Sequence, residues 1–379
     1  MKCLFYLVKL LIFRRMKIKD ILFVVEQLAP LALQENYDNS GVQVGDVNQE
    51  ARAALLCIDV TEEVVDEAIA LGCNLIISHH PLAFKAFKSL TGKNYLERCM
   101  IKACKYDIVI YAAHTNLDNA YDGVNYYLAK MFNLQHVKIL SPQTNALLKL
   151  VTFVPSSHLE VLKTGLFNAG AGTVGNYDKC SYNSIGEGTF RAGEGTDPFC
   201  GKIGELHTET ECRLEVVLPV FRKMEVLRAL LATHPYEEPA YDFYSLENDW
   251  VQAGTGIVGS LPEPMDEEDF LYLVKDTLRL NVLQHSQNIG KMISDVAICG
   301  GSGSFLIPQA IKHGADVLIT GEARYNDFYD VEDKILLAVV GHYESEIFTK
   351  DLFYDLLSNK FTNFAVHKSG YDGNPIKYL

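Results

Sequence analysis

The chain has 379 residues, of which 48% are apolar and 22% charged, an ordinary composition for a globular protein with two or three cores. Its formal net charge is −14, and no basic cluster offsets that charge outside the extreme N-terminus. This balance argues against a nucleic-acid backbone as the main partner and favours divalent cations.

Residues 1–15 combine a short apolar stretch, interrupted by Lys9, with the pair Arg14-Arg15. The stretch is too short to span a membrane and lacks the small-residue cleavage site of a signal peptide. We therefore expect Met16 to open the natural chain, with residues 1–15 a non-native start or disordered. The expected protein is cytoplasmic and has no membrane anchor.

The nine cysteines form no CxxC pair and no regular framework, which favours a reducing compartment. Four of them lie within or beside apolar runs, as buried free thiols do: Cys57, Cys73, Cys104 and Cys299.

Residues 16–148 alternate apolar strands with helices. Strands are predicted at 53–60, 73–78 and 107–112, and helices at 61–70, with Thr61 as N-cap, and at 95–105. This alternation predicts a parallel sheet with crossover helices, in which ligands gather at the carboxyl ends of the strands.

His79 and His80 close the strand at 73–78, and Pro81 follows them. Neighbouring side chains of a strand point to opposite faces, so two adjacent imidazoles do not comfortably chelate one ion. At the end of a strand they can instead reach two ions lying side by side. The strand at 107–112 leads in the same way to His114 and Asp118.

Residues 149–247 differ in composition from the segments on either side, because ten of the chain's 27 glycines lie between Gly165 and Gly204. Strand-like and helical stretches follow one another as strand–helix, glycine-rich strands, strand–helix and strand, the outline of a ferredoxin-like α+β domain. The run at 234–239, HPYEEP, resembles a metal-binding segment, but its two prolines favour a rigid structural turn.

Residues 248–379 resume the α/β rhythm, with strands predicted at 294–299, 315–320 and 335–340. The run GGSGS at 300–304 is expected to open a helix that extends to 313. It is either a tight turn or a phosphate cradle without the lysine of a P-loop. After the last strand, His342 and Glu346 stand four residues apart and can share one helix face.

Three imidazoles and two carboxylates thus fall at predicted strand ends, and they predict a site for two divalent ions, Zn, Fe or Mn. The expected ligands are His79, His80, Asp118, His342 and Glu346. Glu346 or Asp118 must bridge the two ions. Two ions bring a charge of +4 against −2 from these carboxylates, and a bridging hydroxide would leave about one positive charge, which favours an anionic substrate.

Two further residues are expected around the ligands. His114 is an outer hydrogen-bond partner that holds the Asp118 loop, with direct ligation as the alternative. Glu322, like Arg324, is a candidate for the outer layer or for substrate contact. Taken singly, each motif also has a plain structural interpretation, such as a capped strand end or a helix-surface pair.

These motifs resemble the Nif-three-like family of dinuclear-metal proteins, whose members are often labelled GTP cyclohydrolase 1 type 2 homologues. The matching segments are YDNSGVQVG at 37–45, SHHPLAF at 78–84, HTNLD at 114–118, Gly321-Glu322 and GHYESE at 341–346. The resemblance implies the same five metal ligands. Tyr37 replaces the tryptophan with which the first motif commonly begins.

The resemblance also implies the architecture, a two-lobed α/β core with an inserted PII/CutA-like ferredoxin fold. The core would comprise 16–148 and 248–379, folded together around one site, with 149–247 as the insert. Family members form homohexamers with the metal sites facing an internal cavity.

The leading functional hypothesis is a metal-dependent hydrolase that acts on a small anionic, phosphorylated or nucleotide-like molecule. The alternative is a non-catalytic hexameric assembly that binds metal and senses a ligand through its insert. A transcription-factor scaffold, suggested by the family name, finds no support in the acidic composition.

Overall fold

The computed structural model describes residues 16–85 and 88–379 and divides into two compact units. We call the first the core unit; it joins the described residues up to Ser141 with Ala253–Leu379. The second, the middle unit, is Pro142–Gln252 and includes the predicted insert at 149–247. The expectations for residues 1–15 lie outside the described residues. Within the described ranges, no helix is long and apolar enough to cross a membrane.

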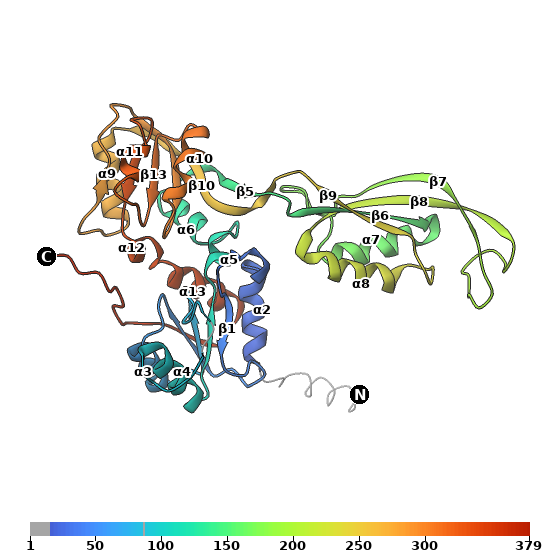
Figure 1. Cartoon of the computed structure of the whole chain (residues 1–379), viewed down its shortest axis with the longest axis horizontal. Helices are drawn as coiled ribbons and strands as arrows, with labels where there is room; N and C mark the ends of the chain where they lie inside the picture. Colours follow the sequence, from blue (N-terminus) through green and yellow to red (C-terminus); the bar gives the residue numbers. More distant parts are fainter. Residues whose placement is uncertain (1–15, 86–87) are drawn as a thin grey trace, which may run out of the picture. The chain divides into compact units, whose positions relative to one another are not determined.

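The first sheet of the core unit, which contains the strand labelled β1 in Figure 1, has the strand order β1-β4-β3-β2-β15, with β1 antiparallel to β4 and the other neighbours parallel. Its strands are β1 (Gly41–Val44), β2 (Ala53–Cys57), β3 (Leu75–Ser78), β4 (Val109–Ala112) and β15 (Ala365–Lys368). Every residue of β2, β3 and β4 is buried, as expected for parallel strands covered on both faces.

Helices cover this sheet because its strands present apolar side chains on both sides. Leu55, Ile76 and Ile110 pack in one cluster with residues of α3 and α4, whereas α13 contacts β2, β15 and α2. These helices are α2 (Ile18–Leu28), α3 (Glu62–Ala70), α4 (Tyr95–Lys105) and α13 (Thr349–Lys360). Thr61 caps α3 as predicted, since its side chain accepts a hydrogen bond from the Val64 N–H.

The second sheet of the core unit has the order β11-β14-β13-β12-β10-β5, with β12, β13 and β14 parallel. Its strands are β5 (Gln135–Gln143), β10 (Trp250–Met265), β11 (Gln284–His285), β12 (Ile293–Cys299), β13 (Val317–Thr320) and β14 (Leu336–Val339). One apolar cluster joins it to α6 and α9, and a second joins it to α10 and the region of α11. Those helices are α6 (Val124–Met131), α9 (Glu267–Thr277), α10 (Ile307–Lys312) and α11 (Asp327–Asp330).

Two details of the core unit differ from the sequence-based expectations. The helix predicted at 300–313 begins later, as a 3-10 turn at Ser304–Leu306 followed by α10, because the glycine run forms a turn first. Cys104 is exposed rather than buried, since α4 directs Cys99, Met100 and Ala103 inward. The eight cysteines of the described ranges are all free thiols.

The middle unit is one four-stranded antiparallel sheet, ordered β7-β8-β6-β9, with two helices. Its elements are β6 (Leu147–Pro155), α7 (Leu159–Asn168), β7 (Tyr182–Arg191), β8 (Leu206–Pro219), α8 (Lys223–Thr233) and β9 (Tyr241–Leu246). The chain order strand–helix–strand–strand–helix–strand with this sheet order is that of a ferredoxin-like unit. Alternate residues of β8, from Cys212 to Leu218, pack with the helices in one apolar cluster.

Three further 3-10 turns complete the described elements. They are η1 (Leu31–Leu33), η2 (Ser156–His158) and η3 (Val220–Arg222). The functional residues predicted from the sequence all lie in the core unit, where the carboxyl ends of parallel strands lead into short helices: α5 (Thr115–Asp118) after β4 and α12 (His342–Glu346) after β14.

Candidate metal centre

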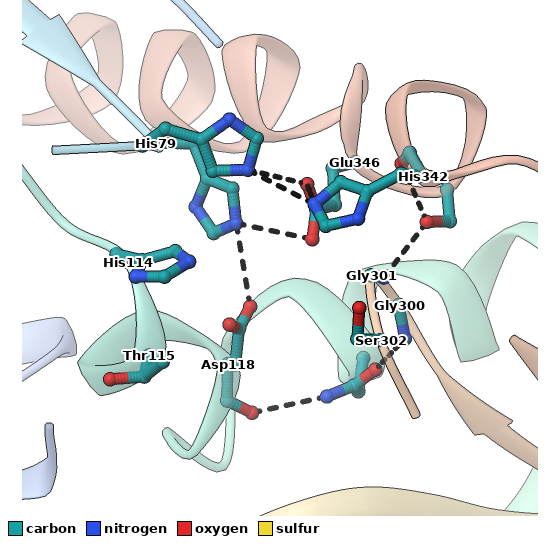
Figure 2. Close-up of polar contacts among 12 residues, drawn as sticks. His79, His114, Thr115, Asp118, Gly300, Gly301, Ser302, His342 and Glu346 are labelled. Atoms are coloured by element: carbon teal, nitrogen blue, oxygen red, sulfur yellow. Dashed lines mark hydrogen bonds and ion pairs between the residues drawn. The ribbon is translucent and has the colours of Figure 1, made fainter. Parts of the chain in front are cut away.

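His79 follows β3 directly and is fully buried. Its backbone N–H donates to the Cys57 carbonyl at 3.2 Å, which prolongs the strand pairing by one residue. Its Nδ1 donates to the Ala113 carbonyl at 2.9 Å, so its other ring nitrogen is directed away from the sheet. That Nε2 atom is buried and has no hydrogen-bond partner among the described residues. It lies 3.6 Å from both Asp118 Oδ1 and Glu346 Oε1 (Figure 2).

His80 is held in the same way by a carboxylate. Its Nδ1 lies 2.8 Å from Asp59 Oδ1, at the end of β2. Its Nε2 lies 2.9 Å from Glu346 Oε2 and 3.3 Å from His342 Nε2. The two histidines of the doublet therefore reach different oxygens of one carboxylate, as expected from their adjacent positions at a strand end.

Asp118 and His114 come from the turn after β4 and from α5. The Asp118 N–H donates to the His114 carbonyl at 3.0 Å, so His114 helps to shape the loop that presents Asp118. The His114 ring also takes part in the site, because its Nδ1 lies 2.8 Å from Asp38 Oδ1 and its Nε2 remains available. Asp38 Oδ2 in turn accepts from the Thr115 N–H and hydroxyl, which fixes the start of α5.

His342 and Glu346 occupy the first and last positions of α12, as their spacing predicts. Gly341 precedes them with φ +101°, a conformation that turns the chain from β14 into the helix. The Glu346 carboxylate is buried, and its Oε2 lies 3.2 Å from His342 Nε2. A Cβ atom on Gly301 would lie 2.4 Å from Glu346 Oε1, so this glycine makes room for the carboxylate.

Glu322 lies on the outer side of His342, with Oε1 3.0 Å from His342 Nδ1. Its Oε2 accepts from the Ser302 hydroxyl at 2.5 Å. Arg324 lines a cavity of about 560 Å³ together with Glu322 and His342, but its exposed side chain is not one of the cluster's donors. Each histidine of the site thus has an oxygen near Nδ1, an arrangement that orients Nε2 toward a metal.

The other two motifs singled out in the sequence are structural. Within the GGSGS run, the N–H groups of Gly300, Gly301 and Gly303 donate to protein side chains, which favours the tight turn over the phosphate cradle. In the HPYEEP run, His234 Nε2 donates to the Phe153 carbonyl at 3.0 Å, and its Nδ1 accepts from the Tyr236 N–H at 3.1 Å. Both ring nitrogens of His234 are therefore engaged with the backbone.

The electrostatics of the site favour positive charge on its ring nitrogens. Burial lowers the pKa of His80, but its hydrogen bonds with Asp59 and Glu346 outweigh burial and raise the pKa to about 10. The pKa of His79 and that of His342 are also raised, in both cases against the effect of burial. Burial raises the pKa of Glu346, but His79 and the other imidazoles outweigh it and hold the pKa well below its usual value. Burial raises the pKa of Asp118.

The spacing of the donor atoms fits metal coordination. Two donors bound to one tetrahedral ion lie about 3.4 Å apart, because each is about 2.1 Å from the metal. The distances from His79 Nε2 to the two carboxylates, and those among His80, His342 and Glu346, are all close to this value. Two overlapping groups of donors lie close enough to hold an ion, and we call their members together with Asp118 the core cluster: His79, His80, His114, Asp118, His342 and Glu346.

The core cluster opens into a cavity of about 950 Å³. Aromatic side chains line it, among them Tyr37, Phe84, Tyr95 and Phe305. Sequence reasoning located the donors but not Asp59, which stands just after β2, nor the role of Asp38 within the segment at 37–45. Their signal was weak, since each is a single acid whose partner is a histidine distant in sequence.

Comparisons with known proteins agree over nearly the whole chain. A family model described as Duf34/NIF3 (NGG1p interacting factor 3) matches residues 16–375. A Halalkalibacterium halodurans protein called GTP cyclohydrolase 1 type 2 homolog is 37% identical over 366 residues, 95% of this chain and 98% of that protein. A Bacillus subtilis protein of the same name is 37% identical over 367 residues, with the same coverage.

The fold comparison gives the same result. The crystal structure of a Bacillus cereus protein related to NIF3 matches with a TM-score of 0.84 and 35% identity, over 97% of this chain and 100% of that one. The resemblance drawn from the motifs is confirmed: the chain belongs to the DUF34/NIF3 family.

Proposed function

We propose that the core cluster binds two divalent metal ions side by side and that the protein is a metal-dependent hydrolase. The observation that carries the proposal is the position of the Glu346 carboxylate. Its Oε1 faces His79, whereas its Oε2 faces His80 and His342. One ion would be held by His79, Asp118 and Glu346, and the other by His80, His342 and Glu346, with Glu346 as the bridge. These nitrogen and oxygen donors suit Zn, Fe or Mn.

The unpartnered Nε2 of His79 supports this assignment. A buried ring nitrogen without a hydrogen bond is costly, and a metal ion between it and the two carboxylates would satisfy all three groups. The oxygens hydrogen-bonded to Nδ1 of His79, His80 and His114 support it as well, because such contacts fix the tautomer in which Nε2 can bind a metal.

The chemistry follows from the donors and from His114. Two such ions would polarise a phosphoryl or carbonyl oxygen of the substrate and lower the pKa of water toward about 7. The ring of His114 lies 5.3 Å from that of His79 and 5.4 Å from that of His80, between centroids. With Nδ1 held by Asp38, its Nε2 is placed to take or give a proton beside the reacting atoms.

The charged and aromatic residues around the core cluster narrow the class of substrate that we expect. Asp38, Asp59 and Glu322 add three carboxylates to Asp118 and Glu346, so five negative charges surround a charge of +4. An anionic group would then be attracted by direct contact with the ions rather than by the field of the whole cavity. The aromatic lining and the volume of about 950 Å³ suit a nucleotide-like molecule, whose base can stack on a ring.

A non-catalytic role is the second candidate, and the middle unit favours it. That unit has the strand and helix order of a ferredoxin-like domain and a cavity of about 630 Å³ of its own. A PII/CutA-like insert of this kind would sense a ligand, and the protein would act as a homohexameric metal-binding assembly. Tyr325 and Tyr329 of the core unit are exposed aromatic residues, and the surface that they form would serve for assembly of subunits.

The experiment that separates these roles combines metal analysis with turnover. The wild-type chain should bind two equivalents of metal at the core cluster and hydrolyse at least one member of a nucleotide and phosphoester panel. Glu346→Gln should lose both metal and turnover, because an amide supplies only one oxygen. Glu344→Gln is the matched control, since Glu344 lies on the same helix and accepts from Asn374 at 2.8 Å.

Two results would count against the proposals. Full metal content in Glu346→Gln would contradict the bridged site. A fully metallated wild-type protein without turnover, whose hexamer dissociates in Glu346→Gln, would support the non-catalytic assembly instead of the hydrolase.

A further inference from the structure

A second group of donor atoms lies in the middle unit and shares no residue with the core cluster. Cys200, His207 and Glu209 each place one donor atom within 4.8 Å of the others. His207 Nε2 is 2.9 Å from Glu209 Oε2, and all three side chains are half-buried. We call these three residues the hairpin cluster, because they lie on β8 and on the loop that joins it to β7. One sulfur, one nitrogen and one oxygen make a set that the core cluster does not contain.

The fold of the hairpin explains why these side chains meet. His207 and Glu209 are two positions apart on β8, so they point to the same face of the sheet. That face is opposite to the one whose alternate residues, from Cys212 to Leu218, pack on the helices. Donors on this face are free of the apolar core and can serve a ligand.

The loop brings Cys200 back over the strand. A backbone hydrogen bond of 2.8 Å from Gly204 to Ala192 closes the base of the loop. Gly201 has φ +78°, and a Cβ atom there would lie 2.9 Å from the His207 Cβ. The loop backbone therefore packs directly on His207, and the residue next to that contact is Cys200. This close approach limits the freedom of the thiol before any ligand binds.

The surroundings of the cluster are aromatic on one side. The Phe190 ring lies 5.3 Å from that of His207, between centroids, and is its cross-strand neighbour. The Tyr236 hydroxyl lies 3.8 Å from Cys200 Sγ and donates to Glu211 Oε1 at 2.8 Å. Phe190 and Tyr236 also line the cavity of about 630 Å³, so the hairpin cluster adjoins that cavity.

We propose that the hairpin cluster is a binding site for a single Zn²⁺ ion, held by Cys200 Sγ, His207 and Glu209. Zinc accepts thiolate, imidazole and carboxylate together, and tetrahedral coordination leaves one position beyond these three ligands. That position is open to water or to a small molecule in the adjoining cavity. Binding releases the thiol proton of Cys200, because the thiolate is the ligand. The site does not depend on the proposed hydrolase function.

Cobalt substitution in the full-length protein tests the site. Co²⁺ bound to a thiolate gives a sulfur-to-metal charge-transfer absorption that nitrogen and oxygen ligands do not give. Wild type should show this absorption, and Cys200→Ser should lose it. Cys180→Ser should retain it, since Cys180 is a half-buried thiol of the same unit outside the cluster. In zinc titrations, Cys200→Ser should bind one equivalent less than wild type.

A second pair of variants keeps the test independent of folding and of the core cluster. His207→Gln should also lose the absorption while retaining the wild-type circular dichroism spectrum. Glu346→Gln should keep it, because that substitution affects the other site. The proposal is overturned if wild type lacks the absorption, if Cys200→Ser retains it, or if Glu346→Gln abolishes it. The last outcome would assign the thiolate to Cys299, which lines the core cavity.

Discussion

The core cluster and the hairpin cluster show two ways of bringing donor atoms together. The core cluster collects residues from His79 to Glu346, buries His79 and Glu346, and places an oxygen near each histidine Nδ1. The hairpin cluster uses a stretch of ten residues, from Cys200 to Glu209, and leaves its side chains half-exposed. Long-range assembly ties the first site to the folding of two sheets, whereas the second requires only one hairpin and its loop.

If the clusters depend on separate apolar cores, a cavity in one core should disable one cluster only. Leu214 packs in the middle unit and Ile76 in the core unit, and both are fully buried. Truncation of either to alanine should cost about 3 kcal/mol of unfolding free energy in its own unit. Leu214→Ala should weaken the thiolate–cobalt absorption and spare the core metals, and Ile76→Ala should do the reverse.

Denaturant titrations would measure the loss of each site. The thiolate–cobalt absorption would monitor the hairpin cluster, and metal release would monitor the core cluster. Loss of both sites in both variants would show that the two units unfold as one and that the clusters do not depend on separate apolar cores.

A smaller effect is expected where a glycine makes room for a ligand. Gly301→Ala should displace Glu346, because the new Cβ would lie 2.4 Å from Oε1. We expect core metal affinity to fall by roughly 100-fold, the upper end of what a disturbed ligand shell costs. Gly314→Ala is the matched control: its φ is +76°, against +59° for Gly301, but no atom lies within 4 Å of the new Cβ.

Competition with a chelator gives the affinities. Both variants carry a strain of about 1–2 kcal/mol from the left-handed backbone. Only Gly301→Ala should lose metal. Equal metal content in the two variants would contradict the role of Gly301 in making room for Glu346.

Local sequence patterns could predict the donors of the core cluster but not the role of Gly301. The His79-His80 doublet and the spacing from His342 to Glu346 predicted the main donors, because strand ends and helix periodicity are local properties. The role of Gly301 depends on the approach of Glu346, 45 residues later on α12, which no local pattern encodes. The pairing of Asp59 with His80 depends in the same way on the order of β2 and β3 in the sheet.

The hairpin cluster escaped prediction for a different reason. Its residues lie in the glycine-rich stretch, where the sequence shows no CxxC or HxxxH spacing. The meeting of Cys200 with His207 is set by the left-handed turn at Gly201. The strand–helix order of the middle unit could be predicted, since apolar alternation and amphipathic periodicity are strong there, but its loop geometry could not.

A substitution of Asp59 should have a smaller effect on metal affinity, because Asp59 contacts the proposed ligand His80 rather than a metal ion. Asp59→Asn keeps a hydrogen-bond acceptor for His80 Nδ1 but removes the charge. Core metal affinity should fall by about tenfold, at the low end of the effect of such outer contacts, and the ion on the His80 side should be lost first. Asp66→Asn provides the control, since exposed Asp66 pairs with Lys102 at 2.9 Å and contacts none of the core-cluster donors. Stepwise metal release that is unchanged in Asp59→Asn would exclude this positioning role.

The smallest effect concerns Glu97, a carboxylate of the core unit that is buried like Glu346 but held by backbone donors. The Thr91 N–H donates to it at 2.7 Å and the Lys93 N–H at 3.2 Å, and these bonds lower its pKa from 4.5 to about 2. A depressed folded-state pKa adds stability that is present above 4.5 and is lost as the pH falls toward 2. Glu97→Gln should therefore flatten the acid side of the stability profile while leaving the core metals in place.

Urea midpoints at neutral pH and across the interval from 4.5 to 2 would measure this change, with exposed Glu63→Gln on α3 as the control. An acid profile parallel to that of wild type would contradict the assignment. Glu97 accepts from the Thr91 and Lys93 N–H groups and the Thr91 hydroxyl, with the Lys93 ammonium at 3.6 Å, whereas Glu346 faces three imidazoles whose nitrogens converge on it. Glu97 and Glu346 are both buried, so what distinguishes the candidate metal-binding carboxylate from the structural one is the identity of its neighbours.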